Sequence, residues 1–259
     1  MPASTVALEI LTDEELSVLT PGPGAVVTPF LSAVPDAERD AVRRTALRGL
    51  VARGIVDPPA VDATATPTPG SDGTEVEVDA MVRQDVLSAL TLRQAARRVV
   101  AVARTTATGQ DFWYAHLVDE IALLEEVGSD GLHRFALGHT AALAELLAGA
   151  TLHPDAADGT GEPVVLTGSP DGEAPPELLE HLGAAYVRAD VLVIDADRDE
   201  RPAMTGLFTG PRGSWSVVAD PTTGRVSARP ETVASLRARV EALASEATAS
   251  TDPATEVAP

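Results

Sequence analysis

The sequence predicts an α+β protein with a pseudo-twofold duplication, in which each half is a roughly four-stranded antiparallel meander sheet with flanking helices. Residues 121–150 and 214–243, offset by 93 positions, each have the pattern of a strand hairpin followed by an amphipathic helix. The offset matches two turn glycines and two apolar helix positions: Gly131 with Gly224, Leu143 with Leu236, and Leu147 with Val240. This pattern indicates an old duplication, because solenoid arrays have shorter periods and more copies.

Two helices are predicted before the first meander. Thr12 is a typical N-cap residue and Glu15 follows three positions later, which is the capping-box pattern, and this helix is expected to end by Pro21. The second helix is expected to run from about Asp36 to Gly54, because apolar residues recur on one helical face between them. The pair is similar to a helix-turn-helix.

Alternating apolar residues between turn signals then predict the same order in each half, which is helix, four strands, helix. In the first half these are a short helix at 81–90, strands at 98–106, 111–118, 120–127 and 132–137, and a helix at 140–147. In the second half they are a helix at 176–183, strands at 185–196, 203–210, 214–220 and 224–229, and a helix at 230–244. Pro230 is expected at the first helical position, where its missing N–H is not needed.

Segments rich in Pro, Ala, Thr, Asp and Gly set the domain boundaries. Such segments bury too little apolar surface to offset the entropy of ordering. Residues 57–74 are therefore predicted to form a flexible loop. The predicted organisation is an N-terminal half at 5–152, a linker at 153–176, a C-terminal half at 177–245 and a disordered tail at 246–259.

Composition excludes several function classes. The net charge of −20 repels polyphosphates, so we expect no nucleic-acid partner. The chain has no cysteine, which excludes disulfides, and no lysine, which excludes a P-loop or a Schiff base. The N-terminus lacks a signal-peptide pattern and no apolar run is long enough to span a bilayer, so we expect a cytoplasmic protein without membrane insertion.

No motif predicts a reaction, a metal site or a cofactor, and we expect a protein that is not an enzyme. Asp195, Asp197 and Asp199 have the alternate spacing of an EF-hand loop. The loop then fails, since Glu200 stands where glycine is needed and Gly206 where the bidentate glutamate is needed. An acidic hairpin turn explains these residues better.

The other candidate groups have structural interpretations as well. Adjacent carboxylates such as Glu125 and Glu126 point to opposite faces of a strand, so they are poor acid–base pairs. Two of the five histidines, His116 and His133, lie on strands of one meander and could approach one another. No HExxH motif is present, so surface or half-buried strand histidines are the favoured interpretation.

Phe112, Trp113 and Tyr114 form the one aromatic cluster in a chain that is 3% aromatic, and they are the candidate partner-binding residues. On a strand, Phe112 and Tyr114 share one face and Trp113 takes the other. If only one face is covered, at least one ring is free to anchor a partner. If helices cover both faces, all three rings are structural.

Four segments resemble the EspG-type chaperones of actinobacterial type VII (ESX) secretion: LTDEELSVL from Leu11, ALRGLVARGIVD from Ala46, ARRVVAVARTT from Ala96, and GRVSARPETVASLRARVEALA from Gly224. The resemblance spans about residues 8–244. It implies a pseudo-twofold α+β fold and a cytosolic chaperone that binds the helical tip of PE/PPE-type secretion substrates without a cofactor. The long Thr/Pro-rich loop after Asp57 departs from that pattern.

Two other functions stay open at this stage. A winged-helix regulator would use the helix at 36–54 to read DNA, although the charge opposes this. A self-assembling structural subunit would use the duplicated sheets as its interface. Neither the oligomeric state nor the cognate substrate follows from the sequence.

Overall fold

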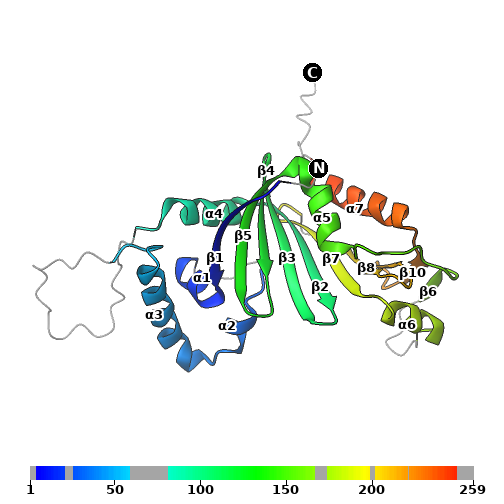
Figure 1. Ribbon diagram of the computed structural model, residues 1–259, viewed down its shortest axis with the longest axis horizontal. Helices are drawn as coiled ribbons and strands as arrows, with labels where there is room; N and C mark the ends of the chain where they lie inside the picture. Colours follow the sequence, from blue (N-terminus) through cyan, green and yellow to red (C-terminus); the bar gives the residue numbers. More distant parts are fainter. Residues whose placement is uncertain are drawn as a thin grey trace, which may run out of the picture.

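A single ten-stranded antiparallel sheet forms the centre of the α+β fold in the computed structural model (Figure 1). The structure describes residues 4–20, 26–58, 81–166, 174–198, 202–220 and 222–249. The strand order is β1-β5-β4-β3-β2-β7-β8-β9-β10-β6. Strands β2 to β5 and β7 to β10 therefore each follow one another as a meander, and β1 and β6 close the two edges.

The helices and strands have the following bounds. The strands are β1 Val6–Thr12, β2 Arg98–Thr106, β3 Gly109–Val118, β4 Ile121–Val127, β5 Leu132–His139, β6 Val164–Leu166, β7 Val187–Asp195, β8 Met204–Thr209, β9 Trp215–Ala219 and β10 Val226–Pro230. The helices are α1 Asp13–Leu19, α2 Pro29–Ala33, α3 Asp36–Ala52, α4 Gln84–Ala95, α5 Leu143–Thr151, α6 Pro176–Gly183 and α7 Val233–Thr248, with a 3-10 turn at Thr140–Ala142.

Helices cover both faces of the sheet, so the molecule has three layers. Alternate residues of β4 show the division, because Leu124 packs with α5 and α7 while Leu123 packs with α1, α3 and α4. In the second half, α6 contributes Leu178 to a small cluster with Trp215. Phe208 packs on that cluster while its neighbour Leu207 faces α5 and α7, so α6 lies on the same face as α1 to α4.

The local signals explain where the helices begin. Thr12 and Glu15 form the predicted capping box at the start of α1, each side chain accepting from the other's backbone N–H. The expectation for Pro230 is wrong, because it is the last residue of β10 and pairs with Trp215. Helix α7 begins after Thr232, whose hydroxyl accepts a hydrogen bond from the N–H of Ser235. Threonine has a side-chain acceptor for a free N–H of the first turn, and proline has none.

The two meanders form one sheet rather than two. Strand β2 pairs with β7 along its whole length, from Arg98 opposite Asp195 to Thr106 opposite Val187. Two strands and one helix that the sequence did not predict, β1, β6 and α2, are present. Strand β6 lies inside the predicted linker at 153–176 and pairs with β10, so part of that segment belongs to the sheet.

Two predicted segments lie largely outside the residues that the structure describes. The predicted loop at 57–74 overlaps the described residues only at 57 and 58, and the predicted tail only at 246–249, where α7 extends to Thr248. The division into two halves stays a prediction. Within the described ranges, no helix has both the length and the apolar character that crossing a membrane requires.

The positions that matched at the offset of 93 have similar roles in the fold. Gly131 and Gly224 lie in the β4–β5 and β9–β10 turns with φ of 68° and 65°. The four matched apolar side chains are all buried in the core cluster between the sheet and helices α5 and α7: Leu143, Leu147, Leu236 and Val240. Their origin by duplication stays a prediction.

Alanine at the two turn glycines gives a matched pair of stability tests. Both substitutions place a Cβ in the left-handed region, which costs about 1–2 kcal/mol. At Gly224 the new Cβ meets nothing within 4 Å, whereas at Gly131 it lies 2.4 Å from Cδ2 of Phe30. We expect Gly131→Ala to reduce the free energy of unfolding in urea by about 1 kcal/mol more than Gly224→Ala. Equal losses would show that Phe30 does not pack over this turn.

Candidate functional site

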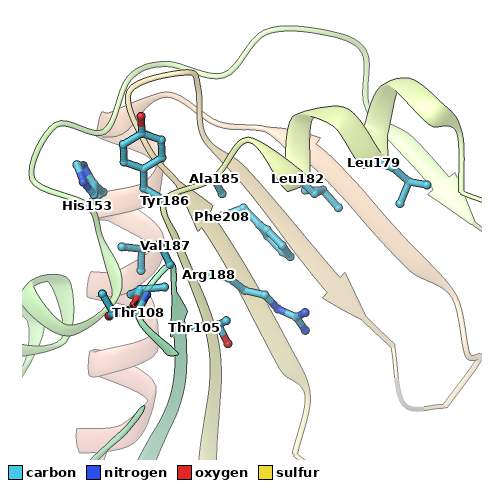
Figure 2. A pocket seen from close by; sticks show the side chains of 13 residues that line it. Thr105, Thr108, His153, Leu179, Leu182, Ala185, Tyr186, Val187, Arg188 and Phe208 are labelled. Atoms are coloured by element: carbon cyan, nitrogen blue, oxygen red, sulfur yellow. Dashed lines mark hydrogen bonds between the residues drawn. The ribbon is translucent and has the colours of Figure 1, made fainter. Parts of the chain in front are cut away.

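An open groove of about 1010 Å³ lies between α6, the β2–β3 turn and the start of β7 (Figure 2). Leu179 and Leu182 project from α6, and the ring of Phe208 lies below Leu182. Tyr186 and His153 stand at the other end of the groove. The remaining lining residues are Thr105, Thr106, Ala107, Thr108, Gly183, Ala185, Val187 and Arg188.

The groove differs in charge from the chain as a whole. The sequence has 39 acidic residues, yet none of the thirteen residues that line the groove is Asp or Glu. Leu179 and Tyr186 keep 56% and 54% of their surface exposed. Exposed apolar side chains that gather in a concave surface are typical of binding sites. The groove therefore suits an apolar ligand or an apolar segment of a protein.

Contacts between distant segments fix the groove walls. The N–H of Tyr186 donates to the carbonyl of Thr209 at 2.9 Å, and the hydroxyl of Thr209 accepts from the N–H of His153 at 2.9 Å. The rings of His153 and Tyr186 pack edge to face with centroids 5.4 Å apart. Arg188 lies over Phe208 at 5.5 Å and pairs with Asp190 at 2.8 Å. These contacts fix the positions of the His153, Tyr186 and Phe208 side chains without a ligand.

The predicted aromatic cluster divides between two faces of the sheet. Trp113 is buried under α5 and α7, and Tyr114 is buried on the opposite face. Phe112 is half-buried on the Tyr114 face. Helices thus cover Trp113 and Tyr114 in this chain, and the prediction that this cluster contacts a partner stays untested.

Register connects Phe112 with the groove. Phe112 is opposite Ala103, and Ala103 is opposite Asp190 on β7, so the three residues form one row across the sheet. Two residues further along, on the same face of the sheet, Thr105 is opposite Arg188, and both line the groove. Successive strands lie about 4.8 Å apart, so Phe112 stands close to the groove on the same face.

A second candidate is a buried ionic cluster between α1, α4 and the sheet. His133 Nδ1 lies 2.7 Å from Oε1 of Glu125, and His133 Nε2 lies 2.6 Å from Oδ1 of Asp13. The other oxygen of Glu125 accepts from Nε of Arg93 at 2.8 Å and lies 2.8 Å from His116 Nε2. His133, Asp13 and Glu125 have no exposed side-chain surface. His116 and His133 thus approach one another with Glu125 between them. The favoured interpretation of surface or half-buried histidines is wrong for these two, because both are buried.

The surroundings shift the protonation of this cluster. Burial alone raises the pKa of the Glu125 carboxyl, but hydrogen bonds from His116 and His133 and the charge of Arg93 outweigh burial, so its pKa lies well below the ordinary range. Burial likewise opposes a charged His133, but its bonds to Asp13 and Glu125 raise the pKa of the imidazole above its ordinary value. The surroundings therefore favour the ionised forms of Glu125 and His133.

Sequence reasoning missed this cluster. From the sequence, Glu125 is treated only as a poor acid–base partner, and Asp13 is not singled out. A glutamate inside the apolar strand IALLEEV, with a histidine on each neighbouring strand, is the signal that was available.

The aspartates with EF-hand-like spacing pair with arginines where the structure describes them. Asp195 pairs with Arg98, and Asp197 pairs with Arg97, so both carboxylates tie β7 to β2, while Asp199 lies outside the described residues. The acidic-turn interpretation agrees with these pairs. Across the part of the chain that the structure describes, no group of three or more His, Cys, Asp or Glu residues is arranged to hold a metal ion.

Comparisons with solved structures give a distant likeness, and the comparisons with sequences give none. No protein-family model matches the chain, and no curated protein matches it. Among solved structures, the chain is similar to a chain in the complex of the Mycobacterium tuberculosis type VII secretion system chaperone EspG5 with the PE25-PPE41 dimer. The TM-score is 0.49 and the identity 11%, over 93% of this chain and 96% of that one. A likeness at this level assigns no function or binding residue.

The ionic cluster makes a stability prediction with a control at the next residue. Glu125→Gln removes the charge that Arg93 and His133 face, and breaking a buried ion pair in this way costs about 3–5 kcal/mol. Glu126→Gln changes an exposed neighbour and should stay within about 0.5 kcal/mol of the parent. Chemical denaturation at pH 7 measures both. If the two variants are equally stable, Glu125 is not ionised in the folded chain.

Proposed function

We propose that this protein is a cytosolic chaperone or adaptor of the EspG type, which binds PE/PPE-like secretion substrates and keeps them soluble for type VII export. The observation that carries the proposal is an apolar groove on a strongly acidic chain, in which none of the described lining residues is Asp or Glu. The four segments that resemble EspG-type chaperones supply the identity of the partner. We also propose that the two meanders arose by duplication and that the protein needs no catalytic centre.

The chemistry of the groove favours a helical protein segment as the ligand. The apolar face of a protruding helix presents side chains and few free backbone groups, so it needs contact area more than hydrogen bonds. Leu179, Leu182, Tyr186 and Phe208 supply such area. Arg188 and the threonines of the β2–β3 turn offer polar contacts at the rim.

The charge of the chain fits the role of keeping a substrate soluble. A net charge of −20 makes the complexes repel one another, while the described residues that line the groove include no carboxylate that would have to be desolvated on binding. An apolar substrate segment can thus be covered without loss of solubility.

Co-expression with each PE/PPE-like pair encoded in the source genome tests the proposal. We expect one pair to co-purify and to form a stable complex by light scattering. Failure of every pair, with the chaperone folded, would overturn it. The alternatives give different results: a DNA-binding regulator shows salt-dependent binding to DNA, and a self-assembling subunit shows a mass that rises with concentration.

A pair of leucines tests whether the groove is the contact surface. Leu179→Glu places a carboxylate in the groove, and Leu87→Glu makes the same change on α4, away from the groove; the two leucines are 56% and 44% exposed, so folding is retained. We expect Leu179→Glu to weaken binding of the co-purifying partner at least tenfold, measured by calorimetry, because the buried charge has no counter-ion. Leu87→Glu should bind as the parent does. Equal binding by both would place the partner elsewhere.

A further inference from the structure

Residues 26–33, which include α2, lie over the sheet and are held by few contacts. Val26 packs against Tyr114 and Val127, and the N–H of Val27 donates to the hydroxyl of Tyr114 at 3.3 Å. The ring of Phe30 packs over Gly131 in the β4–β5 turn. Residues 26–33 thus cover Tyr114 on the face of the sheet that carries the groove.

Asp13 supplies the polar attachment of this segment. The side chain of Thr28 makes no capping hydrogen bond at the start of α2. Oδ2 of Asp13 accepts instead, from the N–H of Phe30 at 2.7 Å and from the N–H of Leu31 at 3.1 Å. One carboxylate on α1 thus caps a helix that is only five residues long.

The same carboxylate depends on His133. Its Oδ1 lies 2.6 Å from Nε2 of His133, and Glu125 lies 2.7 Å from Nδ1. Both neighbours are carboxylates, so only an imidazolium, which carries a proton on each nitrogen, can donate to both. A neutral ring would turn one nitrogen lone pair toward a buried carboxylate at hydrogen-bond distance.

The charges around His133 balance only when it is protonated. Arg93 on α4 and His133 on β5 face the two carboxylates, Asp13 on α1 and Glu125 on β4. His116 on β3 lies against Glu125 through Nε2, and its buried Nδ1 has no hydrogen-bond partner. Loss of the proton from His133 therefore leaves a buried excess of negative charge next to Asp13.

We propose that residues 26–33 form a proton-controlled latch, which an imidazolium at His133 holds closed through Asp13. When His133 loses its proton, its ring can donate to only one of the two carboxylates, which leaves an unbalanced negative charge buried beside α2. Release of residues 26–33 admits water to Asp13 and relieves this charge. Opening of the latch uncovers Tyr114 and Val127, next to half-buried Phe112, on the sheet face that carries the groove. The device acts in this chain alone and does not depend on the proposed function.

The sign of the pH dependence follows from linkage. In the closed form burial lowers the pKa of His133, but its hydrogen bonds to Asp13 and Glu125 outweigh burial, so the pKa is raised. The latch is therefore tightest below the ordinary histidine value of about 6.5, and it loosens as the pH rises from there through the raised pKa. Within that window the opening constant grows by about tenfold per pH unit, and it is level on either side.

Amide hydrogen exchange of the full chain, corrected for intrinsic rates, measures this opening. We expect the protection of Phe30, Leu31 and Val27 to be constant up to about pH 6.5 and then to fall up to tenfold per pH unit, while amides of α7 stay level. Imidazole nitrogen shifts from NMR should show His133 protonated on both nitrogens above pH 6.5. A His133 that titrates at or below the ordinary value, or protection at α2 that follows α7 at every pH, would overturn the proposal.

Two glutamine variants sharpen the test. His133→Gln has no charge at any pH, so α2 should be open or weakly protected throughout, with no dependence on pH. His153→Gln changes a histidine of the groove and should keep the parent pH profile. If His133→Gln retains the profile, another group controls the latch. If this variant does not fold, the nitrogen shifts and exchange of the parent chain still decide.

Discussion

The pairing of β2 with β7 is the constraint on which the rest of this fold depends. It joins two meanders, each with one edge already closed by β1 or β6, into a continuous sheet. Because of this pairing, helices α5 and α7 contact each other and share one core with both halves. The rows of residues that connect the groove with Phe112 exist for the same reason, since they cross the β2–β7 boundary.

The two faces of the sheet are stabilised in different ways. The face under α5 and α7 is mainly apolar, with Leu147 and Leu236 fully buried, and hydrophobic burial of this kind is insensitive to pH. One buried carboxylate, Glu231, accepts hydrogen bonds beside α7 from Ser216, Ser235 and Arg239. The other face, under α1 to α4, includes His133 and Glu125 between its apolar clusters. A buried ionic network is stable only when every charge has its partner. The stability of the layer formed by helices α1 to α4 therefore depends on the protonation of His133 and Glu125.

Local patterns predicted the elements that stand on local physics. The bounds of β2 and α6 agree with the predicted strand at 98–106 and helix at 176–183, because alternation and turn residues define them within a short window. Strands β1 and β6 were missed, since each is stabilised by pairing with a strand distant in sequence. The ionic cluster was missed for a similar reason. Asp13 has a sufficient local explanation as an acid in a first helical turn, and its contact with His133 spans 120 positions.

The groove and the aromatic side chains Phe112 and Tyr114 lie on the same face of the sheet, and helices cover the two halves of this face to different extents. Helices α1 to α4 cover the first half on this face, whereas among the described helices the eight-residue α6 alone covers the second, and the groove beside α6 is open. The row from Phe112 through Ala103 to Asp190 lies between the two coverings. A partner seated in the groove that extended toward the first half would follow this row and then meet residues 26–33. The area that such a partner buries would therefore depend on whether those residues lie over Tyr114, which connects the protonation of His133 with the extent of the binding surface.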